Sequence, residues 1–475
     1  MADYTVPFVI NGEYSIADEV FNVISPESEQ PVHNCGLATT STAQRATAAA
    51  ANAYDAWSRS TPDQRRDILL RATAELEARR EELANVMKGE IGAPQQWADF
   101  NVDTSINMLK GVAGSVSSLQ GHAVQLADPC SSGLVVLEPY GVILAIAPWN
   151  APYILGLRSF LFPIAAGCTV VFKGSELAPR SHYLLVDALH RAGLPPGVLN
   201  FIVTTPDHAA SVTESLIADP AIRKLNFTGS TVVGRIIGKL AGQYLKPAVM
   251  ELGGKGVAIV WKDADLDLAA AECAKGAFLF SGQICMSTEK ILIHQDVSEA
   301  FKGKFLQASR SFLSQSQNPP VLINHQSVAK NQRLLQDAID KGAILLLGDL
   351  ATKQGPTRMM PAVVDKVTVE MDIYKTESFG PSVSLMEVAT EEEALFVAND
   401  TEYGLNSAIF TNDLGRAMRI AKNIRSGAVH INSMTVHDEN ALPHGGTKSS
   451  GWGRFNGLYG LTFLQHSPSI DMLVE

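Results

Sequence analysis

The chain has 475 residues, and 38 Lys and Arg against 49 Asp and Glu give it a formal net charge of −11 at pH 7. This acidic balance argues against a protein that binds nucleic acid or an anionic membrane surface. Hydrophobic residues make up 46% of the chain and charged residues 18%, which excludes disorder as the main state. The length fits two or three domains of ordinary size.

The cysteines and the N-terminus indicate a reducing compartment. The five cysteines never form a CxxC pair, so neither a disulfide framework nor a zinc ribbon is predicted. The first seven residues carry an acidic rather than a basic side chain, and no apolar run approaches the ~18 residues that a membrane span needs. We therefore expect a cytoplasmic protein.

The first 60 residues predict short strands and turns, followed by an alanine-rich helix over residues 42–57. A single longer helix is predicted over residues 63–90. There Leu69, Leu76 and Leu83 recur on one face while charged side chains occupy the other. This helix is expected to cover a sheet.

From residue 141 onward, short apolar runs alternate with helical segments. The apolar runs are residues 142–147, 169–172, 200–203, 225–227 and 257–260, and the helices between them include residues 181–192 and 211–217. Strands this uniformly apolar are buried on both faces. The alternation predicts a doubly wound parallel α/β sheet.

A second series of the same kind predicts a second α/β domain. It comprises helices over residues 266–278, 298–311 and 329–341 and strands over residues 291–294, 344–347 and 382–386. Residues 122–138 and the tail from residue 458 fit neither sheet. Both are expected to be strands that leave the domain bodies and pair elsewhere.

Residues 227–234, Phe-Thr-Gly-Ser-Thr-Val-Val-Gly, follow a predicted strand and open a predicted helix. Free backbone N–H groups at a helix N-terminus form an anion site. The glycine spacing matches neither the GxGxxG fingerprint nor a P-loop. A plain tight turn is therefore the alternative interpretation.

Two motifs offer a nucleophile and a base. Cys285 lies in Ser-Gly-Gln-Ile-Cys-Met-Ser-Thr, a small polar loop after a helix, where a thiol is accessible and its thiolate is a potent nucleophile. Glu251 begins Glu-Leu-Gly-Gly-Lys-Gly, whose glycines allow close backbone approach to one carboxylate. A buried thiol and a solvated carboxylate are the respective alternatives.

Polar residues also end two neighbouring predicted strands. Asn150, in Pro-Trp-Asn, follows the strand at 142–147, and its amide can donate to a developing oxyanion. Lys173 and Glu176 end the next strand, where a carboxylate can accept from ribose hydroxyl groups and repel a 2′-phosphate. A turn residue and a surface ion pair are the alternatives. Further polar turns lie at residues 377–381 and 443–451.

These seven motifs, in this order over nearly the whole chain, resemble those of the aldehyde dehydrogenase superfamily. The resemblance implies a Rossmann-like NAD-binding domain (1–121 and 139–251), a catalytic α/β domain (252–432) and a β oligomerisation arm (122–138 and 456–475). Residues 433–455 would return to the cofactor domain and the substrate tunnel. Members usually form homodimers or homotetramers through the arm.

The resemblance also implies roles for single residues. Cys285 would attack a small-molecule aldehyde, and the Asn150 amide and the Cys285 N–H would form the oxyanion hole. Glu251 would activate the water that hydrolyses the thioester, and Lys173 joins this catalytic set. The implied cofactor contacts are Ala147, Trp149, Lys173, Glu176, Gly229, Ser230, Val233, Leu252, Glu377 and Phe379. Glu176 favours NAD over NADP, and Gly174 stands where the family usually has proline.

Within the superfamily the sequence is most similar to the salicylaldehyde, vanillin and benzaldehyde type, through residues 97–102, 150–158, 282–289 and 435–439. This similarity implies an aromatic aldehyde substrate. The implied substrate contacts are Trp97, Arg158, Ile284 and His444.

Arg158 lies two helical turns past Asn150 and would meet a phenolate or carboxylate of the substrate, while Trp97 would form a ring-stacking wall. An ion pair for Arg158 and core packing for Trp97 are the alternatives. His444 stands where many members have an aromatic residue, and amino-aldehyde members also use histidine there.

Other functions remain open at this level. They are oxidation of an amino-aldehyde or aliphatic aldehyde, acyl transfer or thioester hydrolysis by the same cysteine, and a scaffold without activity. The presence of Cys285, Glu251 and Asn150 argues against the last. His430, His437 and His444 recur every seven residues, but no helix is expected across the following glycines, so no metal site is predicted.

Overall fold

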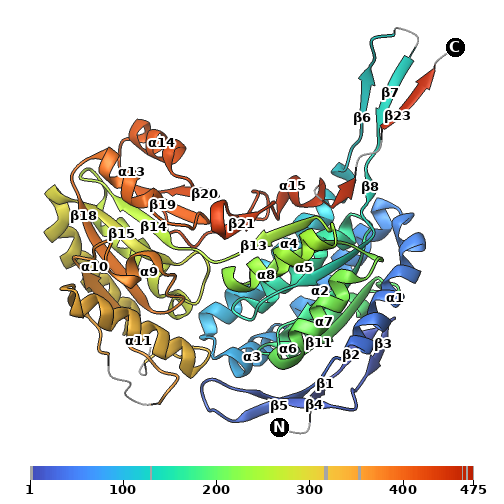
Figure 1. Ribbon diagram of the computed structural model, residues 1–475, viewed down its shortest axis with the longest axis horizontal. Coiled ribbons are helices and arrows are strands. Elements are labelled where there is room, and N and C mark those ends of the chain that lie inside the picture. Colours follow the sequence, from blue (N-terminus) through green and yellow to red (C-terminus); the bar gives the residue numbers. More distant parts are fainter. Residues whose placement is uncertain are drawn as a thin grey trace.

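The computed structural model describes residues 4–128, 131–314, 319–350, 355–462, 464–466 and 469–473. Two large sheets form two lobes, and a narrow β arm projects from one of them (Figure 1). The mixed architecture with parallel strands confirms the predicted α/β fold class. Among the described helices, none has the length and apolarity to cross a membrane.

The first sheet has a parallel centre with antiparallel strands at its edges. Its order is β21 (Gly451–Trp452), β13 (Ala248–Glu251), β12 (Ile222–Thr228), β9 (Val142–Ile146), β10 (Thr169–Gly174), β11 (Leu199–Val203), β2 (Phe8–Ile10) and β3 (Glu13–Ser15). The direction of strand succession reverses between β9 and β12. In such sheets, ligands bind outside the carboxyl ends of the strands at this switch point.

Helices cover both faces of this sheet because alternate strand residues point to opposite sides. Val142, Leu144 and Ile146 belong to one core, and Ile143 and Ala145 belong to the other. The first core is closed by α1 (Thr40–Ser58), α7 (Pro206–Ala218) and α8 (Thr231–Gln243). The second is closed by α2 (Pro62–Ala78), α3 (Arg80–Ile91), α4 (Gln95–Ser115), α5 (Pro152–Ala165) and α6 (Pro179–Arg191).

The single helix predicted over residues 63–90 is wrong, because the structure has α2 and α3 there. They meet at Arg79, which leaves the helical region with φ −110° and ψ 18°. The Arg79 guanidinium lies 2.6 Å from Oδ2 of Asp187 on α6. The spacing of apolar residues within 63–90 carries no information about a partner on another helix. It therefore could not predict this break.

The second sheet has the order β16 (Ile344–Leu347), β17 (Ala362–Asp365), β18 (Ser382–Val388), β15 (Thr288–His294), β14 (Gly256–Val260), β19 (Asn406–Phe410) and β20 (Ala428–Ile431). By its pattern alone, the apolar run at 257–260 continues the first strand series, although the resemblance gives it to the catalytic domain. The prediction from the pattern is wrong, since β14 lies in the second sheet between β15 and β19.

Helices also cover the second sheet on both sides. They are α9 (Leu266–Phe278), α10 (Ser298–Leu313), α11 (His325–Asp340), α12 (Asp372–Lys375), α13 (Glu391–Asn399) and α14 (Leu414–Asn423). Single turns of 3₁₀ helix are η1 (Val116–Ser118), η2 (Leu279–Gly282), η3 (Gln295–Val297) and η4 (Lys448–Ser450).

The two segments that fit neither sheet in the sequence pair with each other. In the arm, β7 (Ser131–Val135) pairs with β6 (His122–Gln125) on one side and with β23 (Ser469–Leu473) on the other. At its base β8 (Glu138–Pro139) pairs with β22 (Gln465–His466), after α15 (Gly457–Thr462). Figure 1 shows this arm extending away from both lobes.

A small N-terminal sheet completes the fold. It contains β1 (Thr5–Val6), β5 (Pro31–Gly36) and β4 (Val20–Ile24). Four cysteines are free thiols in the described residues, and the fifth, Cys130, lies outside them.

Candidate active site

A strained turn presents Cys285 between the two lobes. Phe280, Ser281 and Gly282 have successive φ values of 44°, 58° and 69°, all in the left-handed region. For Phe280 and Ser281 this costs about 1–3 kcal/mol each and persists only where the surroundings hold it. A Cβ on Gly282 would lie 2.1 Å from the carbonyl oxygen of Gly380, so only glycine fits there.

The side chain of Gln283 holds this turn from inside, and it is fully buried. Its Oε1 accepts a hydrogen bond from the N–H of Ile323 at 2.9 Å, and its Nε2 donates to the carbonyl oxygen of Val321 at 3.3 Å. Its own carbonyl oxygen accepts from Nδ2 of Asn150 at 3.0 Å. The loop that bears Cys285 is thereby tied to the end of β9.

Asn150 is oriented by contacts at both its backbone and its side chain. Trp97 Nε1 donates to the Asn150 carbonyl oxygen at 2.9 Å. An amide nitrogen has two hydrogens, and Gln283 takes one of them. In the described structure the other has no partner, so it can serve an oxygen atom bound beside Cys285.

Glu251 ends β13 and faces Cys285, with only 1% of its surface exposed. Burial, followed by the charge of Glu251 and a hydrogen bond to it, raises the pKa of the Cys285 thiol well above its usual range. The chain after Glu251 passes very close to the cysteine, because a Cβ on Gly254 would lie 2.3 Å from the Cys285 carbonyl oxygen. The glycines of this motif therefore allow the carboxylate and the thiol to meet.

Behind the cysteine lies a row of charged and polar groups. Arg158 on α5 is 1% exposed and forms an ion pair with Asp438. Asp438 Oδ1 accepts from Nδ2 of Asn456 at 2.7 Å and lies 3.9 Å from Nδ1 of His444. His444 Nε2 in turn lies 3.9 Å from Oε1 of Glu251. Burial lowers the pKa of Arg158, while the charge of Glu251 raises it.

Trp97 and Ile284 are both buried. The Trp97 ring stacks on Phe280 at a centroid distance of 5.6 Å and on Phe100 at 5.4 Å. With only 2% of its surface exposed, Trp97 offers little free ring face to a substrate. Its clearest contacts are those that hold Asn150 and the turn before Cys285.

The turn between β12 and α8 has the form expected of an anion site. Ser230 caps α8, its Oγ accepting from the N–H of Val233 at 3.3 Å. A Cβ on Gly229 would lie 2.7 Å from the ring of Phe227. Val233 is 44% exposed at the start of the helix, whereas Leu252 is buried.

Glu377 and Phe379 come from the second lobe, opposite the turn between β12 and α8. Glu377 accepts from the N–H of Gly254 at 2.8 Å, and burial raises the pKa of its carboxyl to about 7. Phe379 has φ 48°, and its ring meets that of Trp149 edge-on at a centroid distance of 6.0 Å. A Cβ on Gly253 would lie 2.6 Å from Glu377 Oε2, so a larger residue there would displace the Glu377 carboxylate.

Lys173 lies at the end of β10 with its side chain largely buried. Burial lowers the pKa of its ammonium, and the charge of Glu176 acts in the opposite direction. Ala147 comes directly after β9, the strand next to the one that carries Lys173. These residues lie at the same carboxyl edge of the sheet as Asn150.

A cavity of about 280 Å³ joins eight of the predicted site residues. It is lined by Pro148, Trp149, Asn150, Leu155, Leu177, Thr228, Gly229, Ser230, Glu251, Gly253, Cys285, Ile323, Asn324, Ser327, Lys330, Glu377, Ser378 and Phe379. Its lining does not include the four predicted substrate contacts, Trp97, Arg158, Ile284 and His444. Nor does it include Ala147, Lys173, Glu176, Val233 or Leu252.

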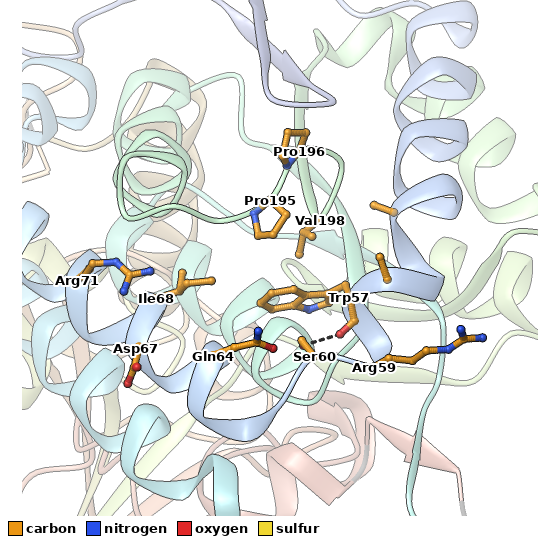
Figure 2. A pocket seen from close by; sticks show the side chains of 12 residues that line it. Trp57, Arg59, Ser60, Gln64, Asp67, Ile68, Arg71, Pro195, Pro196 and Val198 are labelled. Atoms are coloured by element: carbon orange, nitrogen blue, oxygen red, sulfur yellow. Dashed lines mark hydrogen bonds between the residues drawn. The ribbon is translucent and has the colours of Figure 1, made fainter.

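A separate hollow of about 520 Å³ lies between α1 and α2 (Figure 2). There Ser60 Oγ donates to the Trp57 carbonyl oxygen at 2.5 Å, and Gln64, Ile68, Pro195 and Val198 lie around the Trp57 ring. The hollow contains none of the predicted site residues.

Residues 14–470 match the model of the aldehyde dehydrogenase family. The chain belongs to this family. It is therefore an oxidoreductase of the family that oxidises aldehydes with NAD or NADP. Within the described residues, no group of three or more His, Cys, Asp or Glu side chains could hold a metal ion.

This aldehyde dehydrogenase is 43% identical over 459 residues to the vanillin dehydrogenase of Pseudomonas sp. (strain HR199 / DSM 7063), covering 95% of this chain and 94% of the relative. The crystal structure of a salicylaldehyde dehydrogenase from Pseudomonas putida G7, complexed with salicylaldehyde, matches with a TM-score of 0.94 and 34% identity over 98% of each chain. An NAD-dependent aldehyde dehydrogenase from Sinorhizobium meliloti matches with a TM-score of 0.95 and 30% identity, over 99% of this chain and 95% of that one.

The structure also shows residues to which the sequence analysis assigned no role. Asp438 and Glu289 lie within the motifs that carry the resemblance, yet their partners are 280 and 89 positions away. One signal for Glu289 was present: it is a carboxylate in a fully buried strand, shortly before the apolar run at residues 291–293. Asp438 offered no such signal.

Proposed function

We propose that this aldehyde dehydrogenase oxidises an aromatic aldehyde to the carboxylic acid, with NAD in preference to NADP. The observation that carries the substrate class is the buried guanidinium of Arg158, which lies within electrostatic range of both Cys285 and Glu251. A planar cation there suits a phenolic or acidic ring. The relatives named for vanillin and salicylaldehyde support the same class.

Cys285 begins the reaction. Its thiol gives up a proton to Glu251, whose charge acts on it, or to solvent, and the sulfur bonds to the aldehyde carbon. Negative charge then develops on the carbonyl oxygen. The free Asn150 amide hydrogen and the Cys285 N–H stabilise that charge. When bound, NAD supplies the hydride acceptor that turns the resulting thiohemiacetal into a thioester.

Glu251 acts in the second half of the reaction. Its carboxylate takes a proton from a water molecule as the water oxygen adds to the thioester carbon. The carbon–sulfur bond then breaks, which releases the acid and leaves Cys285 ready for another turnover. A carboxylate placed in this way favours water as the acyl acceptor over acyl transfer to another acceptor.

The residues of the groove fit NAD. The N-terminus of α8 with Gly229 and Ser230 would hold the pyrophosphate, beside Trp149 and Val233. Glycine at 229 keeps this turn close to the Phe227 ring, since a Cβ there would meet that ring at 2.7 Å.

The same groove favours NAD over NADP. Glu176 and Lys173 would contact the adenosine ribose, where the Glu176 carboxylate accepts from hydroxyl groups and repels a 2′-phosphate. Ala147 and Leu252 flank the cofactor, and Glu377 and Phe379 hold its nicotinamide end.

The arm favours assembly into a homodimer or homotetramer. Its outer strand β6 pairs only with β7 in the described structure, and all four of its residues are exposed. An open strand edge of this kind is a template for pairing with another chain. We infer separately that the enzyme is cytoplasmic.

A panel of aldehydes tests the proposed function. Initial rates of NADH formation are compared for benzaldehyde, salicylaldehyde, vanillin, hexanal and an amino-aldehyde, with NADP in place of NAD as a second series. We expect the aromatic aldehydes to lead in kcat/KM by about 10-fold or more, and NAD to lead NADP. A lead for hexanal or the amino-aldehyde would contradict the substrate class.

A further inference from the structure

His444 lies between two carboxylates that come from different parts of the chain. Its Nε2 is 3.9 Å from Oε1 of Glu251, and its Nδ1 is 3.9 Å from Oδ1 of Asp438. Its backbone is fixed by two hydrogen bonds with Phe455, at 2.9 and 2.8 Å. The imidazole is 6% exposed, so the surrounding protein fixes its position.

The facing atoms of Glu251 and His444 have no hydrogen-bond partner among the described residues. In the part of the chain that the structure describes, Glu251 Oε1 and His444 Nε2 are both buried without a hydrogen bond. Buried polar atoms of this kind are uncommon in folded proteins and call for an explanation. A small side-chain rotation or one bridging water molecule would join the two atoms. Either arrangement makes a path for a proton.

Four charged side chains lie around His444. Arg158 on α5 and Arg454 after β21 are positive, whereas Glu251 and Asp438 are negative. Burial, followed by the charge of Arg158, lowers the pKa of His444, so its imidazole is neutral at neutral pH. Asp438 beside Nδ1 favours the tautomer with the proton on that nitrogen. The lone pair of Nε2 then faces Glu251.

More distant histidines complete the surroundings. His430 on β20 carries a pKa lowered to about 4 by burial and by the neighbouring imidazoles of His437 and His444. It therefore adds no positive charge at neutral pH. Asp438, 9% exposed at its side chain, faces Nδ1 of His444 and offers a route for a proton toward solvent.

We propose that His444 is the proton acceptor behind Glu251 in thioester hydrolysis, and that Asp438 orients it for that role. This inference rests on the proposed function. Water gives one proton to Glu251 as its oxygen bonds to the acyl carbon. The O–H bond on Glu251 then breaks and an N–H bond forms at Nε2 of His444, which restores the carboxylate. The imidazolium passes its Nδ1 proton to Asp438 and on to solvent, so no charge accumulates, and proton exchange with water returns the imidazole to the Nδ1–H tautomer before the next turnover.

His444 is a positioning residue in this scheme, because it acts through Glu251 and does not touch the acyl group. The imidazolium would stand between two carboxylates, which stabilise it against the nearby arginines. An aromatic ring, which many family members carry at this position, could not accept a proton. The relay is thus a property of this chain's own residues.

The test separates hydrolysis from the earlier steps. His444→Gln keeps a polar side chain but cannot take up a proton, and His437→Gln, on a half-exposed neighbouring imidazole, is the matched control. Rapid mixing with saturating NAD and the best aldehyde gives the NADH formed in the first turnover and the steady rate. Mass spectrometry of quenched samples then measures the fraction of Cys285 that carries the acyl group.

For His444→Gln we expect an undiminished first turnover, a steady rate about 10- to 100-fold lower, and acyl-enzyme accumulation. The acid limb of the pH–rate profile should lose one ionisation and become shallower. Imidazole added to His444→Ala should restore part of the rate. His437→Gln should behave as the unmodified enzyme.

An unchanged steady rate and an unchanged acid limb in His444→Gln would overturn the proposal. If that variant gave no first turnover, His444→Phe would replace it, with the same expectations. Failure of the unmodified enzyme to oxidise any aldehyde of the panel would instead overturn the proposed function. The two failures are thus distinguishable.

Discussion

Glu289 and Ser378 are joined by three hydrogen bonds, although they lie 89 positions apart. The Ser378 N–H donates to both carboxylate oxygens, at 3.0 and 2.9 Å, and its Oγ donates to Oε2 at 2.7 Å. Nζ of Lys255 lies 2.5 Å from the same carboxylate, and both charged side chains are buried. A buried ion pair therefore holds the loop that carries Glu377 and Phe379.

Glu289→Gln should weaken cofactor binding and stability together. The substitution leaves the Lys255 ammonium buried without its counter-charge, and breaking a buried pair in this way costs about 3–5 kcal/mol. We expect a lower urea midpoint and a higher KM for NAD, with KM for the aldehyde nearly unchanged. Glu387→Gln, in a half-exposed pair with Lys302, is the control and should change neither. Equal effects of the two substitutions would contradict the role given to Glu289.

Arg158→Ala should discriminate among aromatic substrates. Loss of the guanidinium removes the group proposed to meet a phenolate or carboxylate, so KM should rise more for salicylaldehyde and carboxylated benzaldehydes than for benzaldehyde. The variant also leaves Asp438 without its cation and should be less stable by about 3–5 kcal/mol. Kinetics are therefore measured well below the unfolding midpoint.

Arg158→Lys provides the matched comparison for that experiment. It keeps the charge but loses the planar fork, so it should keep part of the preference for charged rings. Equal increases in KM for all aldehydes in both variants would show that Arg158 serves only the ion pair with Asp438.

Binding of NAD should depend on pH through Glu377. Burial raises the pKa of this carboxyl to about 7, so it is protonated at lower pH and ionised at higher pH. An ionised carboxylate accepts from hydroxyl groups more strongly. KM for NAD should therefore fall as the pH rises through about 7. Glu377→Gln should remove this dependence, and Glu402→Gln, in an exposed pair with Arg235, should keep it.

The parts of the fold that could be predicted are those written in local patterns. Val142 to Ile146 are all apolar because alternate residues enter the cores on opposite faces of one sheet. Such a run predicts a central parallel strand, and the polar residues after it predict a site at the switch point. Asn150, Glu251 and Cys285 meet there because their strands and turns end at one cavity.

The parts that could not be predicted depend on distant partners. The break at Arg79 accompanies an ion pair with Asp187, 108 positions away. The separation of β14 from the first sheet depends on pairing with β15 and β19, which its apolar composition cannot reveal. The Arg158–Asp438 pair and the approach of His444 to Glu251 likewise bring together segments far apart in the chain.

The most direct test of the account is the fate of the acyl group in Glu251→Gln. The amide cannot take a proton from water, whereas Cys285 should still form the thioester, because its thiol proton can also leave to solvent. With saturating NAD and aldehyde, the account predicts one NADH per subunit in a rapid first phase, slow later turnover, and a mass increase equal to one acyl group on Cys285. Full steady turnover of Glu251→Gln, or a first phase with no acyl group on Cys285, would contradict it.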